Sequence, residues 1–279
     1  MTSEPKIVEL ETGVYARLHE GLTNGGIIIG DESVLVIDSL RVPSFARDLI
    51  SDVNKLTRKP IKYVINTHSH WDHSWGNQEF LESIIIGHQN CYQEMLDIEW
   101  NASWRQKIVK AHDSWSEEAN LVNITPPNML FDTTMQLHFG SREIDLVYLG
   151  KAHTSGDIFI YLPEDRIVFT GDVAQDKGVP YLGDCYPRQW PETDDLLIQI
   201  QADRFISGHG PIGNHEALIE SRDFICALVD NLQFCIQDGR DEPSATSYTV
   251  DALAVRFGDW RNFDRLKETL PGVYRKLKI

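Results

Sequence analysis

The residues with the clearest chemical potential lie in the stretch VINTHSHWDHSWGN, residues 64–77. It holds His68, His70, Asp72 and His73 within six positions, directly after an apolar run. At the end of a strand, residues two apart point the same way, so His68 and His70 can converge on one point. Asp72 and His73, beyond a turn, can face a second point beside it. Buried together without a cation, such groups would lack partners and repel one another, so the stretch predicts a metal site.

Three further ligand-type residues each follow an apolar run that reads as a strand. His153 follows DLVYLGKA, Asp172 ends RIVFTGD, and His209 lies in RFISGHG. Loops at strand ends are where a rigid sheet can aim side chains at one site. With the first cluster, these residues supply enough histidines and aspartates for two metal ions that share a bridging carboxylate. Imidazole and carboxylate ligands without thiolate suit zinc, and also iron or manganese.

The elements that must position these residues alternate between strands and helices. Residues 6–39 read as short strands joined by turns, 42–56 as a helix, and 61–67 as a strand that ends on the histidine cluster. The order strand, helix, strand is typical of a βαβ unit. We expect a single domain over residues 1–279, with a helical insertion at about 91–125 and a helical C-terminal tail at about 214–279.

Apolar residues recur at helical spacing within the predicted insertion. Trp100, Trp104, Ile108, Ala111 and Trp115 follow one another at steps of four, four, three and four. This spacing predicts one helix face that packs on the core. The alternatives are a lid over a substrate pocket and a dimer surface, and the second of these would make the protein a homo-oligomer.

The overall composition excludes several classes of partner. The chain has 279 residues, 42% of them hydrophobic, which is enough for a large core. Its formal net charge of −16 and pI of about 5.0 disfavour binding to phosphate backbones and anionic membranes. The four cysteines form no CxxC pair, which argues against a thiolate zinc site. We therefore expect a small-molecule substrate, with no nucleic-acid or membrane partner.

The N-terminal residues bear on localisation. They lack a basic start followed by a long apolar segment, so they do not read as a signal peptide. No stretch approaches the roughly 18 apolar residues that a membrane span needs. The sequence therefore predicts a cytoplasmic protein, provided that no leader has been removed.

The motifs THSHWDH, AHTSGD, FTGD and SGHG, in this order, resemble those of the metallo-β-lactamase superfamily of metallohydrolases. The resemblance implies an α/β (α+β) fold, a four-layer αββα sandwich in which helices flank two mixed β-sheets. The metal site would lie at the edge between the sheets. The resemblance further implies that Asp38, at the end of VLVID, orients a ligand from the second shell. It assigns His68, His70 and His153 to a first metal, Asp72, His73 and His209 to a second, and Asp172 to the bridge between them.

The resemblance and the ligand types predict a dinuclear zinc-dependent hydrolase. A hydroxide held between the metals would attack the carbonyl of a small ester, lactone, thioester or amide, including β-lactam-like amides. Asp72 would accept the hydroxide proton or pass it to the leaving group. The alternative is a mononuclear iron oxygenase of the same fold that acts on persulfides, and metal identity separates the two.

The loop after Asp172 bears on the substrate. It most resembles the corresponding segment of true β-lactamases. However, Gln175 stands where the nearest of those enzymes have a carboxylate-binding lysine, and Tyr181 where they have an asparagine. With Asp172 in place of their thiolate ligand and with no leader, a secreted β-lactamase is the less favoured interpretation. We predict that Trp71, Lys177 and Tyr181 line the substrate pocket.

Overall fold

The computed structural model describes residues 4–279, whose strands form one seven-stranded and one six-stranded sheet. The first sheet follows the chain order, and the second has the order β13-β12-β11-β10-β9-β8. The strands of the first are β1 (Lys6–Glu11), β2 (Val14–Leu18), β3 (Gly25–Ile29), β4 (Val34–Ile37), β5 (Ile61–Ile65), β6 (Ile84–His88) and β7 (Met129–Phe131). Those of the second are β8 (Thr134–Phe139), β9 (Arg142–Val147), β10 (Phe159–Leu162), β11 (Ile167–Gly171), β12 (Arg204–Ser207) and β13 (Gly213–Asn214).

Both sheets are mixed. Strands β1 to β4 pair antiparallel and β4 to β7 pair parallel. In the second sheet β11 and β12 pair parallel, and the other neighbours pair antiparallel. The sequences of β4 and β11, which are apolar except for Thr170, fit strands that are covered on both faces, and every residue of both is buried. Because parallel strands end at the same edge, the loops after β4 and β5 lie together, as do those after β11 and β12.

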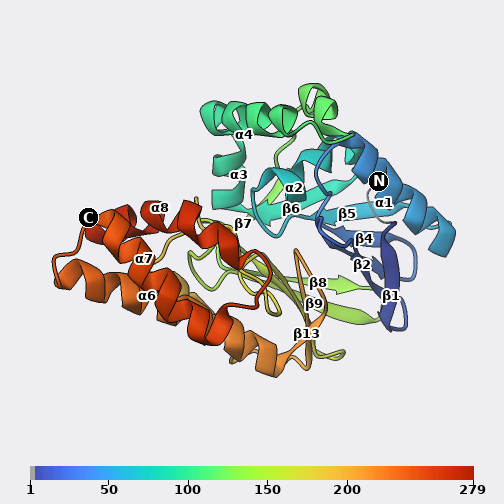
Figure 1. Ribbon diagram of the computed structural model, residues 1–279. Coiled ribbons are helices and arrows are strands. Elements are labelled where there is room, and N and C mark those ends of the chain that lie inside the picture. The colour runs from blue at the N-terminus through green and yellow to red at the C-terminus, as the bar shows by residue number, and fades with distance from the viewer. Residues whose placement is uncertain (1–3) are drawn as a thin grey trace.

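Helices lie outside both sheets (Figure 1). The structure places α1 and α4 on the side of the first sheet, and α5 to α8 on the side of the second. The α-helices are α1 (Pro43–Leu56), α2 (Trp71–Ser74), α3 (Gln89–Met95), α4 (Ile98–Ala111), α5 (Trp190–Leu197), α6 (His215–Gln237), α7 (Glu242–Phe257) and α8 (Leu266–Lys278). Short 3₁₀ segments are η1 (Trp75–Phe80), η2 (Ser116–Leu121) and η3 (Phe263–Arg265).

Three apolar cores separate the layers. The middle core lies between the sheets and joins Ile28 and Ile65 of the first to Ile160 and Ile206 of the second. A second core packs α1 and α4 on the first sheet, and a third packs α5 to α8 on the second. Helix, sheet, sheet and helix therefore form four layers, which confirms the predicted αββα sandwich. Among residues 4–279, no helix is both long and apolar enough to cross a bilayer.

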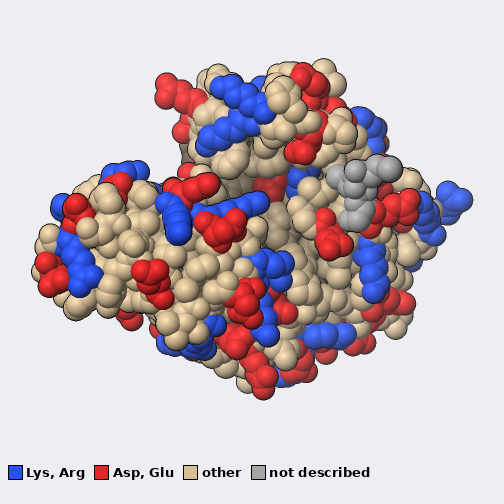
Figure 2. Space-filling view, viewed as in Figure 1, with Lys and Arg blue, Asp and Glu red and all other residues tan. Residues whose placement is uncertain are grey.

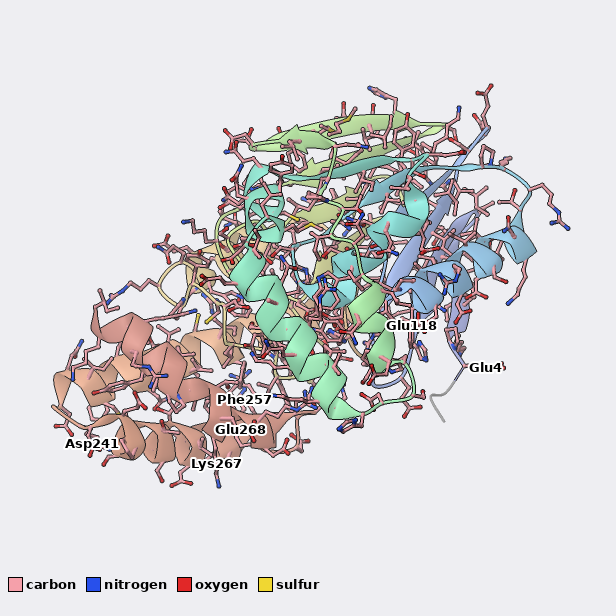
Figure 3. All side chains as sticks on the ribbon, turned by 90° about the horizontal axis from the view of Figure 1, so that it is seen from above. Glu4, Glu118, Asp241, Phe257, Lys267 and Glu268 are labelled. Carbon is pink, nitrogen blue, oxygen red and sulfur yellow. The ribbon has the colours of Figure 1, made fainter. Side chains whose placement is uncertain are left out.

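The tryptophan-rich segment departs from its prediction. The prediction of a single helix face that includes Trp115 is wrong. Helix α4 ends at Ala111, and His112 takes a left-handed conformation with φ 56°. Beyond it the Ser116 hydroxyl accepts a hydrogen bond from the main-chain N–H of Asp113, a local bond of the kind that competes with helix formation. The η2 segment then folds back beside α1, where Glu118 lies (Figure 3) and accepts a hydrogen bond from the main-chain N–H at residue 44.

Candidate metal centre

Strand ends bring the predicted ligands to one edge of the sandwich. Asp38 follows β4, His68 follows β5, Asp172 follows β11 and His209 follows β12. His153 lies in the loop between β9 and β10. Strands of both sheets thus contribute to one centre, as expected from the apolar run that precedes each residue.

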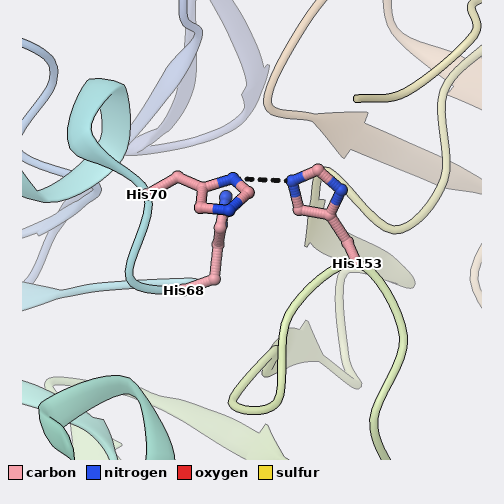
Figure 4. A group of neighbouring side chains, drawn as sticks. All are labelled: His68, His70 and His153. Carbon is pink, nitrogen blue, oxygen red and sulfur yellow. Dashed lines mark hydrogen bonds between the residues drawn. The ribbon is translucent and has the colours of Figure 1, made fainter. Parts of the chain in front are cut away.

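The predicted ligand residues fall into groups of three whose ligand atoms all lie within 4.8 Å of one another. Figure 4 shows the group from the first loop and the β9–β10 loop, in which His70 Nδ1 lies 2.8 Å from His153 Nε2. The groups are His68 with His70 and His153, His68 with His73 and Asp172, and Asp72 with His73 and His209. The structure therefore brings together all seven residues that the sequence nominated as ligands.

Asp38 orients two of these histidines. His73 Nδ1–H donates to Asp38 Oδ2 at 2.7 Å, and Thr67 donates its main-chain N–H and its hydroxyl to the same carboxylate. The Thr67 oxygen in turn accepts from His68 Nδ1–H at 2.9 Å. With Nδ1 held in both rings, Nε2 faces inward. Neither Nε2 has a hydrogen-bond partner among the described residues. Asp38 itself adopts φ 60°, a strained conformation of the kind found at functional sites.

The outer nitrogens of two further ligands are also held. His70 Nε2–H donates to Asp184 Oδ2 at 3.2 Å, and the same oxygen accepts from Trp100 Nε1–H of α4 at 3.0 Å. Burial would raise the pKa of Asp184, but the hydrogen bonds from His70 and Trp100, together with the charges of His70 and His153, outweigh it and lower the pKa to about 2. His209 Nδ1–H donates to the carbonyl of Leu22 at 2.9 Å. Such partners fix the tautomer and direction of a metal-binding imidazole.

Asp172 lies between the groups. Its Oδ1 is 3.4 Å from His73 Nε2, and its Oδ2 is 3.6 Å from His153 Nε2 and 3.3 Å from His209 Nε2. This is the position that a bridging carboxylate requires. The main chain at Gly208 passes so close that a Cβ there would overlap Asp172 Oδ1. Only glycine fits at that position.

The protonation of the site favours a cation. Burial lowers the pKa of His68 well below its ordinary value and that of His153 to about 3, so both rings keep a free lone pair. Burial would raise the pKa of Asp172, but the charges of His209 and His73 hold it well below its ordinary value. Burial would lower the pKa of His209, but Asp172 and Asp72 raise it to about 10. A metal ion between these groups would take the place of that proton.

These observations show that the donor set fits a metal ion. The inward nitrogens His68 Nε2 and His73 Nε2, together with Asp172 Oδ1, are buried and have no hydrogen-bond partner among residues 4–279. Buried polar atoms of a folded protein are otherwise almost always paired. Neutral imidazoles and carboxylates are the ligands that zinc, iron and manganese accept.

Asp72 is held by residues that the sequence did not indicate. The Thr23 hydroxyl donates to Asp72 Oδ2 at 2.9 Å and accepts from Arg41 Nη2–H, also at 2.9 Å. The Arg41 guanidinium is buried beside aromatic rings. Their centroids lie 5.0–5.5 Å from its carbon, and the rings belong to Phe45, Trp71 and Trp115. This packing fixes the cation that holds Thr23 in place.

Glu94 of α3 joins two ligand-bearing loops. Its Oε2 accepts from the Ser69 hydroxyl at 2.6 Å, and its Oε1 accepts from the main-chain N–H and the hydroxyl of Ser155. One carboxylate thus fixes the loops that carry His70 and His153 relative to each other. No spacing pattern marks Glu94, Thr23 or Arg41 in the sequence, because each is a lone polar residue on a separate element.

A cavity of about 1010 Å³ opens onto the centre. Its lining includes the candidate ligands His70, Asp72, Asp172 and His209, and the rings of Trp71, Trp104 and Tyr181. Trp71 and Tyr181, which we predict to line the substrate pocket, both line this cavity. Lys177 is not among the residues of the described chain that line the cavity. At Lys177 the chain turns with φ 46°, and its carbonyl accepts from the main-chain N–H of Arg261.

Comparison with known proteins decides the family. The family model described as the metallo-beta-lactamase superfamily matches residues 20–209, more than half of the chain. The chain belongs to the metallo-beta-lactamase superfamily. It is 25% identical over 236 residues to a metallo-beta-lactamase type 2 of Bacillus sp. (strain 170), covering 80% of this chain and 83% of that protein. It is 24% identical to the 2,4-dinitroanisole O-demethylase subunit alpha of Nocardioides sp. (strain JS1661), covering 75% of this chain and 57% of that protein.

Solved structures agree on the fold. A metallo-beta-lactamase from Pontibacter korlensis matches with a TM-score of 0.64 at 18% identity, over 80% of this chain and 99% of that one. At this identity the likeness establishes the sandwich alone. The superfamily membership makes this protein a metal-dependent hydrolase by family. Residues 210–279, which include α6 to α8, lie beyond the segment that the family model matches.

Proposed function

We propose that this superfamily member is a dinuclear zinc hydrolase that cleaves a small ester, lactone, thioester or amide. One observation carries the proposal. The inward atoms of the imidazoles and of Asp172 converge at the floor of an open cavity, while hydrogen bonds hold the outer nitrogens of four of the histidines. His68, His70 and His153 would hold one ion, Asp72, His73 and His209 the other, and Asp172 would bridge them.

Bound zinc would supply a hydroxide at neutral pH and would polarise the substrate carbonyl. Residues of the chain orient the metal ligands. Asp184, Asp38 and the carbonyl of Leu22 each fix an imidazole, so the ligands need little rearrangement to bind. The apolar rings of Trp71 and Trp104 cover one side of the cavity and would keep the body of a substrate away from water.

We assign proton transfer to Asp72. Its carboxylate lines the cavity, and its pKa is held well below its ordinary value, because His73 and His209 outweigh the effect of burial. It is therefore ionised at neutral pH, and can take up the proton of the attacking hydroxide and pass it to the leaving group. Asp72→Ala should abolish turnover. Near-full turnover by this variant with its metal still bound would contradict the assignment.

Metal content per chain, measured by elemental mass spectrometry on protein purified without chelators, tests the proposal first. We expect about two zinc ions per chain. About one iron per chain would favour the mononuclear oxygenase that acts on persulfides, and oxygen consumption with a persulfide would then decide.

A substrate panel tests the reaction class. It should contain a lactone, a thioester, an aryl ester and a β-lactam. An aryl methyl ether belongs in it as well, because the Nocardioides relative is named as a subunit of a 2,4-dinitroanisole O-demethylase. Zinc-dependent turnover of at least one carbonyl substrate is expected. Cleavage of the ether alone would refute the carbonyl substrate class.

A further inference from the structure

One wall of the cavity comes from the C-terminal segment, outside the part of the chain that the family model matches. Arg261, Asn262, Arg265 and Thr269 all line it. The main chain of Arg261 is fixed to the loop after β11: its N–H donates to the Lys177 carbonyl, and its own carbonyl accepts from the N–H of Val179, both at 3.0 Å. Substitution of the arginine side chain leaves both bonds in place.

A second contact fixes the same wall from α8. Lys276 Nζ donates to the carbonyls of Gly183 and Cys185, each at 2.8 Å. The C-terminal segment therefore holds the loop of residues 177–185 at both ends. The wall is a built part of the cavity and not a loosely placed tail.

The guanidinium of Arg261 crosses the main chain directly after His209. A Cβ at Gly210, where φ is 90°, would overlap this guanidinium, so the glycine allows the close approach. The guanidinium has five N–H groups. Among the described residues one of them has a hydrogen-bond partner: Nη2–H donates to the carbonyl of Asp176 at 2.7 Å. Arg265 lines the cavity without an ion-pair partner in residues 4–279.

Outside the candidate ligands, the lining of the cavity has more basic than acidic residues, unlike the chain as a whole. Apart from the candidate ligands, the charged lining residues are Lys6, Arg41, Arg261 and Arg265 against Glu4 and Glu20. The chain as a whole has 42 acidic residues against 26 Lys and Arg. Figure 2 shows basic side chains at the rim of the hollow, on a surface where acidic side chains are common. Such a local excess of positive charge attracts anions.

The cavity is also lined by aromatic rings. Trp71 and Trp104 stack with ring centroids 6.0 Å apart, and Tyr181 meets Trp104 edge-on at 5.4 Å. A ligand that contacts both the arginines and these rings carries an anionic group and an apolar or aromatic body.

We propose that Arg261, assisted by Arg265, binds an anionic group of the substrate, so that the enzyme prefers anionic esters or amides with an aromatic body. This rests on the proposed hydrolase function. The guanidinium would donate two hydrogen bonds to a carboxylate, a geometry that a lysine ammonium cannot reproduce.

A pair of esters that differ in a single group tests the preference in the zinc-loaded enzyme. They are 4-nitrophenyl pentanoate and mono-4-nitrophenyl glutarate, in which a carboxylate replaces the terminal methyl. Arg261→Gln should lower kcat/KM for the glutarate about ten- to hundredfold and change that for the pentanoate less than about twofold. Arg261→Lys should lie between. Equal losses for both esters, or no loss for either, would overturn the proposal.

Binding of a non-hydrolysable pair separates this proposal from the hydrolase assignment. Tryptophan fluorescence should report tighter binding of 4-phenylbutyrate than of 4-phenylbutyramide, and Arg261→Gln should abolish the difference. Lys267→Gln is the matched control, because Lys267 is exposed on α8, on the outside of the C-terminal helices (Figure 3). If neither ester is hydrolysed but the binding difference holds, the hydrolase assignment fails and the anion site stands. Equal affinity of the acid and the amide would overturn the anion site.

Discussion

Replacing Thr23 by valine removes one hydroxyl from beneath Asp72 and leaves the shape of the side chain almost unchanged. The hydroxyl is the link between the buried Arg41 guanidinium and Asp72 Oδ2, with both hydrogen bonds at 2.9 Å. In Thr23→Val the carboxylate loses its donor, and Arg41 Nη2 loses its acceptor. Arg41 Nε already has no hydrogen-bond partner among the described residues, so the aromatic rings around the guanidinium remain its main contacts.

The size of the effect follows from the charges involved. A hydrogen bond to a charged group contributes about 1.5–3 kcal/mol, and the Thr23 hydroxyl is buried, so water does not replace it easily. If that energy serves to orient Asp72, its loss weakens metal binding by the Asp72, His73 and His209 group about ten- to hundredfold. Asp72 is absent from the group of His68, His70 and His153, so the affinity of that group should change little.

Zinc titration in competition with a chromophoric chelator measures both affinities in one experiment. We expect one binding step to be unchanged and the other to weaken in Thr23→Val. Thr23→Ser keeps the hydroxyl and is the matched control, with both steps close to those of the wild type. The reasoning is refuted if Thr23→Val binds two zinc ions as tightly as Thr23→Ser, or if the valine variant weakens both steps equally.

Three further substitutions probe other parts of the structure. Lys276→Met frees the loop whose carboxylate holds His70, and should weaken binding at that metal group about tenfold in the same titration. Gly208→Ala forces a methyl group against Asp172, and should lower the metal content of the purified protein. Burial raises the pKa of Asp194 well above its ordinary value, so the folded protein keeps a proton that the unfolded chain loses above about pH 4. The stability that this gives is lost as pH rises, by up to about 1.4 kcal/mol per unit, so the melting temperature of Asp194→Asn should increasingly exceed that of the wild type as pH rises above about 5. If the difference in melting temperature between the two proteins did not change with pH, this reasoning would be contradicted.

The sandwich could be predicted because its signals are local. The mostly apolar sequences of β4 and β11 are typical of buried strands, and each strand is followed by an aspartate of the candidate metal centre, Asp38 or Asp172. The candidate ligands are also visible, since four of them fall within six positions of the sequence. The C-terminal end of helix α4, by contrast, has no clear signal in the apolar spacing. Apolar spacing continues to Trp115, but the turn at His112 and the bond between Asp113 and Ser116 end the helix first.

The residues that orient the ligands give no such signal. Thr23 acts on a carboxylate 49 positions away, and Asp184 on a histidine 114 positions away. Each is one polar residue on a loop, and only the packing of both sheets and α8 brings it to the centre. The same holds for Arg261, whose main chain pairs with residues 177 and 179. The ligand motif therefore predicts where metals bind, while segments outside it, residues 4–41 and 210–279 among them, shape the cavity. Within one superfamily, a shared motif can thus serve different substrates, because the surrounding wall is supplied by a different part of the chain.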